Sequence, residues 1–220
     1  MKDPARALAR FDERIRASES TFLIGVDEAG RGCLAGPVVA AAVVLPVKAR
    51  CPGLDDSKRL TPEARAEHAR TIRGMALAVA FAFVGPRRID AVNIRQASLQ
   101  AMRAAVLRAR TRLGHGNPPS PPLIQVLIDG LDVVPGIDIA QQALIAGDGR
   151  SLAIAAASVV AKTVRDGFMV RLGLDFPHYG FERHKGYGTE EHLEALDHHG
   201  PCRWHRYSYS PVAQGVLFRL

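Results

Sequence analysis

The sequence predicts an α/β fold in which helices flank a mixed five-stranded sheet. Two or three apolar, strand-length segments lie early in the chain and are joined by short connections, which favours antiparallel pairing. Later strand-length segments follow a long helical stretch, and a strand reached through such a crossover pairs in parallel with an earlier one. A long helix at 152–172, apolar almost all round in its first half, is expected to lie buried against this sheet.

The individual elements follow from apolar runs, turn residues and helix caps. A charged amphipathic segment at 4–18 is expected to form a leading helix. Strands are expected where short apolar runs end at glycine or acidic residues; these runs are 21–26, 37–45, 77–84, 123–128 and 141–146. Helices are expected where Thr61 and Pro62 supply an N-cap and first turn, and where apolar residues recur at helical spacing; these segments are 61–73, 90–113, 152–172 and 190–198.

Composition indicates a reduced, basic protein that attracts phosphate. The net charge is +7 at a pI of about 9.8, which favours encounter with nucleic acid, although a merely soluble basic surface fits equally well. Only five of the 29 basic residues are lysines. The three cysteines are widely spaced and indicate no disulfide framework. The N-terminal segment is too charged for a signal peptide and the longest apolar run is strand-sized, so we expect a cytoplasmic protein with no membrane contact.

Four acidic residues lie where strands end beside glycine. Asp27 and Glu28 close the first strand, Asp129 closes the fourth, and Asp148 follows the fifth. If the first and fourth strands are neighbours, their terminal aspartates converge, and oxygen-only ligands suit Mg²⁺ or Mn²⁺. The alternative is that these acids only terminate strands and cap turns. Adjacent strand residues point to opposite faces, so either the glycine-rich continuation distorts the chain or Glu28 contributes less directly.

At these residues the chain resembles ribonuclease HII. Six sequence blocks occur in the order of that family; they are GVDEAGRG at 25–32, LDDSKRL at 54–60, IDG at 128–130, AAASVVAK at 155–162, HKGYGT at 184–189 and HRYS at 205–208. The resemblance covers about residues 22 to 213. It implies the ribonuclease H-like fold and an endoribonuclease that hydrolyses the RNA strand of RNA–DNA hybrids. It also implies cutting 5′ of ribonucleotides embedded in duplex DNA. This activity would give the protein a role in ribonucleotide removal during DNA replication and repair.

The resemblance implies catalysis by two divalent ions, Mg²⁺ or Mn²⁺. Their ligands would be Asp27, Glu28, Asp129 and Asp148, with Asp27 bridging the two ions, and the products would carry a 5′-phosphate and a 3′-hydroxyl. A non-catalytic nucleic-acid-binding module of the same fold is the main alternative, and a nuclease acting on DNA junctions is a weaker one. The four carboxylates argue against the binding module, because acids facing phosphates do not help binding alone.

The resemblance also implies how the substrate is read. The turn Gly30-Arg31-Gly32 and Tyr187 are expected to sense the ribose and to stack on the following deoxyribose, since glycine lets backbone approach a sugar closely. The alternative is a structural turn with a packing tyrosine. Phosphate contacts are expected from five further side chains, although Lys162 on its apolar helix could instead pair with an acid; these are Ser57, Lys58, Asn93, Lys162 and Lys185.

By this comparison the chain divides into three segments. Residues 1–20 are expected to form an N-terminal helical lead-in and residues 21–176 the ribonuclease H-like catalytic domain. Residues 177–220 are expected to be a C-terminal helical or irregular extension that packs on the same domain and binds substrate. Residues 214–218 resemble a short peptide that docks on replication sliding clamps, although packing of this apolar end onto the domain is the simpler interpretation.

The chain departs from the family pattern at two positions. Cys33 stands where the family usually has proline, which predicts that thiol-modifying reagents slow cleavage. Ala146 precedes Gly147 and Asp148 where the family often has lysine. A minor alternative is a zinc site built from residues near the C-terminus; these are His198, His199, Cys202 and His205.

Overall fold

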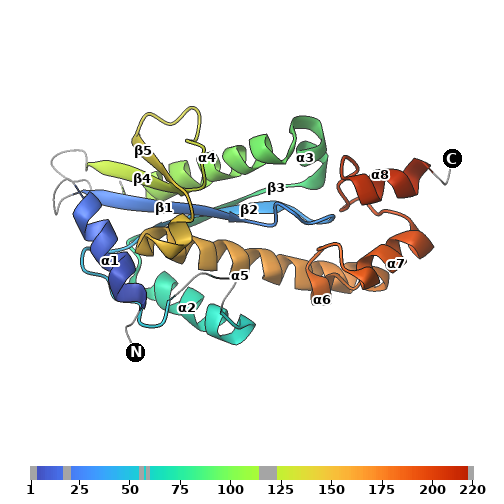
Figure 1. The fold of residues 1–220 in the computed structure, drawn as a ribbon, viewed down its shortest axis with the longest axis horizontal. Helices are drawn as coiled ribbons and strands as arrows, with labels where there is room; N and C mark the ends of the chain where they lie inside the picture. The colour runs from blue at the N-terminus through green and yellow to red at the C-terminus, as the bar shows by residue number, and fades with distance from the viewer. Residues whose placement is uncertain (1–3, 17–20, 55–56, 58–59, 114–122, 218–220) are drawn as a thin grey trace.

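The computed structural model describes residues 4–16, 21–54, 57, 60–113 and 123–217. Its strands form one sheet in the order β3-β2-β1-β4-β5 (Figure 1). β1 (Phe22–Ala29) pairs antiparallel with β2 (Val38–Val44), which pairs antiparallel with β3 (Ala78–Val84). β4 (Ile124–Asp129) runs parallel to β1, and β5 (Ala140–Leu144) runs parallel to β4. The predicted mixed five-stranded sheet is therefore confirmed.

Two long helices cover the two faces of the sheet (Figure 1). α4 (Ile94–Leu113) packs on one face, where Val26 and Val126 belong to its core. α5 (Leu152–Asp175) packs on the other, with the predicted burial throughout its first half. Every residue of β2 is buried, because its small side chains alternate between these two cores.

Shorter helices complete the layer that contains α5. α2 (Pro62–Met75) begins at the predicted cap, where Thr61 Oγ1 accepts the N–H of Ala64, and it packs on α5. α1 (Pro4–Ile15) places Asp12 at the start of α5, where Asp12 Oδ2 accepts the N–H of Ala153 at 2.9 Å. The leading helix is therefore attached to the N-terminus of the central helix.

The helix expected at 90–113 is two helices. α3 (Pro86–Val92) begins at Pro86, and α4 begins at Ile94. Between them Asn93 has a φ of 69°, and its Oδ1 accepts the N–H of Gln96 at 3.0 Å. Asn93 therefore breaks the helix and caps the next one, a use to which its short polar side chain is suited.

The chain after Asp175 is more helical than predicted. It contains η3 (Pro177–Tyr179), α6 (Phe181–His184), the expected α7 (Glu190–His199) and α8 (Ser210–Leu217). These elements gather at one end of the molecule, around the C-terminal part of α5 (Figure 1). The proline-rich segment at 117–122, which has the composition of a stiff linker, lies outside the described residues. No helix in the described ranges is both long and apolar enough to cross a membrane.

Candidate active site

The ends of β1 and β4 bring two of the predicted carboxylates together. In the parallel register Val26 lies opposite Ile128, so Asp27 and Asp129 are the next neighbouring pair. Side chains alternate along strands, and Val26 and Ile128 both face the α4 core. Asp27 and Asp129 therefore both point to the α5 face, and the predicted convergence of these strand ends is confirmed.

The convergence of these carboxylates makes the charged form of Asp27 unfavourable. Its side chain is 5% exposed, and burial raises the pKa of its carboxyl well above the usual value. The charges of Glu28 and Asp129 raise that pKa further, while hydrogen bonds from Ser158 and from the Glu28 N–H lower it. The site therefore disfavours charge on Asp27 unless a cation is present.

Glu28 occupies the opposite face of β1. The ladder with β2 stays regular through Glu28 and Ala29, so the chain does not distort between Asp27 and Glu28. Glu28 Oε1 pairs with Arg31 at 3.2 Å. Burial raises the pKa of Glu28, Arg31 lowers it, and the charge of Asp129 raises it. Of the two possibilities left open by the sequence, the structure favours the less direct contribution of Glu28.

Asp148 reaches this region through the turn η2 (Gly147–Gly149). The N–H of Gly147 donates to Asp129 Oδ1 at 2.6 Å, so the residue preceding Asp148 is fixed to the end of β4. Asp148 is 8% exposed, and its Oδ1 accepts the N–H of Gly149 at 2.9 Å. Ala146, the departure from the family pattern, adopts a left-handed φ of 51° at the start of this turn.

The donor set suits a hard divalent cation. In the described part of the chain, no group of three or more His, Cys, Asp or Glu side chains is gathered closely enough to hold a metal ion by itself. Carboxylate oxygens nevertheless dominate the region, and they are the ligands that Mg²⁺ and Mn²⁺ prefer. The raised pKa of Asp27 is what crowded carboxylates without a counter-charge produce, and a cation would relieve it. The residues fit the implied ions.

The alternative zinc site is not supported. The two ring nitrogens of His205 are engaged, Nδ1 by the N–H of Cys202 and Nε2 by His192. Neither nitrogen is available to a metal without breaking one of these hydrogen bonds.

Two buried arginines shape the turn that follows β1. Gly30 has a φ of 94°, and a Cβ there would lie 1.9 Å from Nε of Arg165. The guanidinium of Arg206 donates to the carbonyls of Gly30 at 2.6 Å and Arg31 at 2.7 Å. Both arginines are fully buried. Arg206 holds the carbonyl side of the turn inward and Arg165 packs against Gly30, while Arg31 and Gly32 remain exposed.

Tyr187 lies close to this turn. Its side chain is 42% exposed, and its ring faces the ammonium of Lys162 at 5.4 Å and the guanidinium of Arg165 at 6.0 Å. Burial raises the pKa of Tyr187, and the neighbouring thiol of Cys33 raises it further. Cys33 is fully buried, which argues against the expected inhibition by thiol reagents because burial limits their access to this sulfur.

The residues expected to contact phosphate are placed differently from one another. Ser57 is buried, and its hydroxyl lies 2.9 Å from that of Ser158, the partner of Asp27. Lys162 pairs with Asp166 at 2.7 Å, which is the alternative considered for it. Lys185 Nζ donates to the carbonyls of Glu182 and Arg183.

The structure does not add support for a phosphate contact at the remaining two residues, Asn93 and Lys58. Asn93 is exposed but caps α4, as described above. Lys58 lies outside the described residues. Their contacts with phosphate stay predictions.

Sequence reasoning missed three residues that organise the site. Arg165 and Arg206 support the Gly30 turn, and Ser158 connects Ser57 to Asp27. Ser158 and Arg206 lie in sequence blocks that were recognised but given no role. The only local signal for Arg165 is a charged residue at a buried position of an apolar helix.

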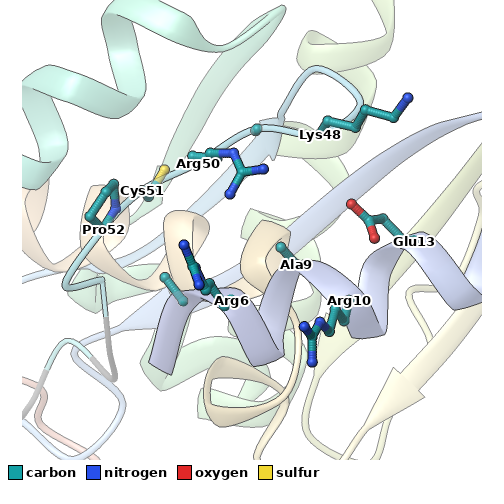
Figure 2. Close-up of a pocket in the computed structure, with 10 residues that line it drawn as sticks. Arg6, Ala9, Arg10, Glu13, Lys48, Arg50, Cys51 and Pro52 are labelled. Carbon is teal, nitrogen blue, oxygen red and sulfur yellow. The ribbon is translucent and has the colours of Figure 1, made fainter. Parts of the chain in front are cut away.

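A basic hollow of about 560 Å³ lies elsewhere, between α1 and the segment that follows β2. Figure 2 shows Arg6 and Arg50 reaching into it from opposite sides. In the antiparallel register the end of β2, Val44, lies opposite Ile24 near the start of β1. The hollow is therefore at the other end of the sheet from Asp27, and none of the predicted site residues that the structure describes lines it.

Comparison with known proteins agrees with the geometry. Residues 24–212 match the family model for ribonuclease HII. The chain is 47% identical to "Ribonuclease HII" of Geobacillus kaustophilus over 94% of this chain and 75% of that protein. It is 49% identical to "Ribonuclease HII" of Verminephrobacter eiseniae over 90% of this chain and 89% of that protein.

Solved structures show the same fold. Ribonuclease H2 from Pyrococcus horikoshii superposes with a TM-score of 0.67 at 24% identity, covering 90% of this chain and 99% of the other. RNase HII in the PCNA:RNase HII complex from Archaeoglobus fulgidus gives the same TM-score and identity, covering 86% and 95%. Bst-RNase HIII in complex with Mn²⁺ gives 0.67 at 19% identity, covering 90% and 70%. On the family match and these identities, the chain belongs to the ribonuclease HII family of enzymes.

Proposed function

We propose that the protein is an endoribonuclease that hydrolyses the RNA strand of RNA–DNA hybrids and cuts 5′ of ribonucleotides embedded in duplex DNA. The products are a 5′-phosphate and a 3′-hydroxyl. The observation that carries this proposal is the convergence of Asp27 and Asp129 on one face of the sheet. This pair lies at the end of β1 that leads into the Gly30 turn. The proposed cation ligands and the turn that is proposed to admit the sugar therefore lie next to each other.

The ions of this reaction would be held by Asp27, Glu28, Asp129 and Asp148. Two bound Mg²⁺ or Mn²⁺ ions would supply an activated water and would stabilise the leaving oxygen. The protein contributes orientation, because backbone N–H groups fix one oxygen of Asp27, of Asp129 and of Asp148. Burial contributes as well, since charge interactions strengthen where water is excluded.

Recognition of the substrate is assigned to the exposed side of the turn and to Tyr187. Gly30, Arg31 and Gly32 would approach the ribose, and the exposed ring of Tyr187 would stack on the next sugar. The contacts with flanking phosphates are assigned to the predicted set; this set is Ser57, Lys58, Asn93, Lys162 and Lys185.

A sliding clamp is proposed as a partner through residues 214–218. The solved PCNA:RNase HII complex supports this, because that relative is seen with a clamp. In this chain Gln214 is exposed on α8, while Phe218 lies outside the described residues. Deletion of residues 214–220 should remove binding to the clamp of the same organism, and unchanged binding would contradict this assignment.

The proposed activity is tested with a DNA duplex that carries one ribonucleotide. With Mg²⁺ or Mn²⁺, the protein is expected to cut this duplex on the 5′ side of the ribonucleotide and to leave an all-DNA duplex intact. Asp129→Asn should abolish cutting and leave duplex binding largely unchanged, because it removes a ligand charge without changing the side-chain shape. Equal cutting of both duplexes, or no cutting by the unmodified protein, would overturn the proposal.

Gly32→Ala separates substrate recognition from folding. A Cβ at Gly32 meets no atom within 4 Å, so the free energy of unfolding should change by less than ~0.5 kcal/mol. The added methyl group would lie where the ribose is expected to approach, and we expect roughly a tenfold or larger loss in kcat/KM, equivalent to about 1.4 kcal/mol. Gly167→Ala on α5, also without close neighbours, is the control. Full activity of Gly32→Ala would remove this turn from substrate recognition.

A further inference from the structure

Three buried histidines lie behind the turn that carries Tyr187. His184 is 8% exposed, while His192 and His205 are fully buried. The rings of His184 and His192 are stacked with centroids 4.4 Å apart, and His205 lies 5.2 Å from His192. The proposed chemistry uses none of them, although polar side chains in a core require a structural or functional reason.

Their hydrogen bonds fix which ring nitrogen carries each proton. His192 Nδ1 lies 2.8 Å from the carbonyl of Tyr187, and because a carbonyl only accepts, Nδ1 carries the proton. His205 Nδ1 accepts the N–H of Cys202 at 2.9 Å, so His205 carries its proton on Nε2. That Nε2 donates to His192 Nε2 at 3.0 Å. The chain of bonds is complete only when both rings are neutral.

Burial keeps them neutral. It lowers the pKa of His192 to about 4 and that of His205 to about 3. The neighbouring His184 lowers both values further, and Glu191 partly opposes this at His192.

His184 holds the same turn from the other side. Its Nε2 donates to the carbonyl of Tyr179 at 2.6 Å, and its Nδ1 accepts the N–H of Gly186 at 3.1 Å. The turn is therefore held at two consecutive residues, by its N–H at Gly186 and by its carbonyl at Tyr187.

The turn needs this support because its backbone is unusual. Lys185 has a φ of 53°, a left-handed conformation that is unfavourable for a non-glycine residue, and Gly186 has a φ of 82°. A Cβ at Gly186 would lie 2.5 Å from the carbonyl oxygen of Ala35, and the N–H of Leu34 donates to Gly186 O at 2.8 Å. The turn is thus pressed against the segment that continues from the Gly30 turn.

We propose that His192 is a positioning residue that holds Tyr187 in place for substrate recognition, and that His205 fixes the tautomer His192 needs. This inference rests on the proposed function, because it assigns His192 an effect on cleavage that passes through Tyr187. His192 itself touches no substrate.

The test is a double-mutant cycle on the duplex with one ribonucleotide. His192→Leu removes the donor to the Tyr187 carbonyl and is expected to lower kcat/KM roughly tenfold. His192→Asn keeps an N–H donor near the position of Nδ1 and should recover most of that loss. In a Tyr187→Ala background, His192→Leu should cause no further loss of kcat/KM, because the tyrosine side chain that His192 is proposed to position is already absent. His198→Leu, exposed on the same helix, is the control.

The outcomes separate the two proposals. Failure of the unmodified protein to cut refutes the proposed function. Cutting by that protein, together with losses from His192→Leu and Tyr187→Ala that multiply, refutes the positioning role. If His192→Leu does not fold, His205→Asn takes its place, because it keeps an acceptor for the Cys202 N–H but removes the donor to His192 Nε2. His205→Asn is expected to reduce kcat/KM only when Tyr187 is present.

Discussion

Asp27→Asn is expected to abolish cleavage and, at the same time, to raise the melting temperature of the metal-free protein. The carboxyl group is buried beside Glu28 and Asp129, and both burial and those charges raise its pKa. An amide of the same shape removes the repulsion but also removes a proposed metal ligand. We expect at least a ~1000-fold loss of kcat, corresponding to several kcal/mol of lost metal stabilisation.

The stability effect has a defined pH dependence. Because the folded pKa of Asp27 lies above that of an unfolded carboxyl, the folded chain holds this proton more tightly. The contribution of this proton to the free energy of unfolding is fully present below about pH 4 and is lost as the pH rises through the folded pKa of Asp27. The advantage of Asp27→Asn should therefore grow from pH 4 upward, and a gain of about 1 kcal/mol would raise the melting temperature by roughly 2–4 °C.

Thermal unfolding in EDTA, measured across pH, checks this expectation. Asp132→Asn is the control, since Asp132 is a partly exposed carboxylate away from Asp27 that pairs with Arg95 at 2.5 Å. A melting temperature of Asp27→Asn that is lower than that of the unmodified protein at neutral pH would contradict the electrostatic account of the site.

Gly25→Ala is expected to destabilise the protein by more than ~3 kcal/mol. A Cβ at Gly25 would lie 2.0 Å from the carbonyl carbon of Ala153 and 2.4 Å from the nitrogen of Ile154. Both are main-chain atoms of α5, so the helix itself would have to move away from β1. Ser158 would move with it and lose its contact with Asp27, so activity should fall with stability.

Urea unfolding measures this effect. Gly167→Ala in α5 is the matched control, because Gly167 lies inside the helix, a Cβ there meets nothing within 4 Å, and alanine favours a helix interior by about 1 kcal/mol. We expect opposite signs for the two substitutions. A Gly25→Ala protein with unchanged stability would mean that α5 does not pack on β1 as closely as described.

The sequence allowed the central pair of carboxylates to be predicted because the rule behind it is local. Apolar runs ending in Asp27 and in Asp129 identify two strand ends, and a helical crossover between them predicts parallel pairing. Parallel neighbours end at the same edge, so convergence follows. The orientation of Glu28 was left open by the sequence, because its outcome depends on whether β1 stays regular, which only the register with β2 reveals.

The supporting contacts could not be predicted in the same way. Arg206 reaches the carbonyl of Gly30 and His192 reaches that of Tyr187, and a backbone carbonyl leaves no signature in a sequence. The break at Asn93 was missed because apolar spacing continues across it, whereas the left-handed φ and the cap are properties of one residue. The sequence pattern of apolar residues therefore predicts where strands end. The side chains that hold the following loops in place are known only from tertiary contacts.

The central claim is that a metal site lies at the ends of β1 and β4. Binding of Mn²⁺ in the presence of a duplex with one ribonucleotide tests this claim most directly, and electron paramagnetic resonance of the free ion measures that binding. Removal of one proposed ligand at a time, by Asp27→Asn, Glu28→Gln, Asp129→Asn and Asp148→Asn, is expected to reduce bound Mn²⁺ in every case, with the smallest reduction for Glu28→Gln. Asp132→Asn should bind as the unmodified protein does. Unchanged Mn²⁺ binding by Asp27→Asn and Asp129→Asn would contradict a metal site at the ends of β1 and β4.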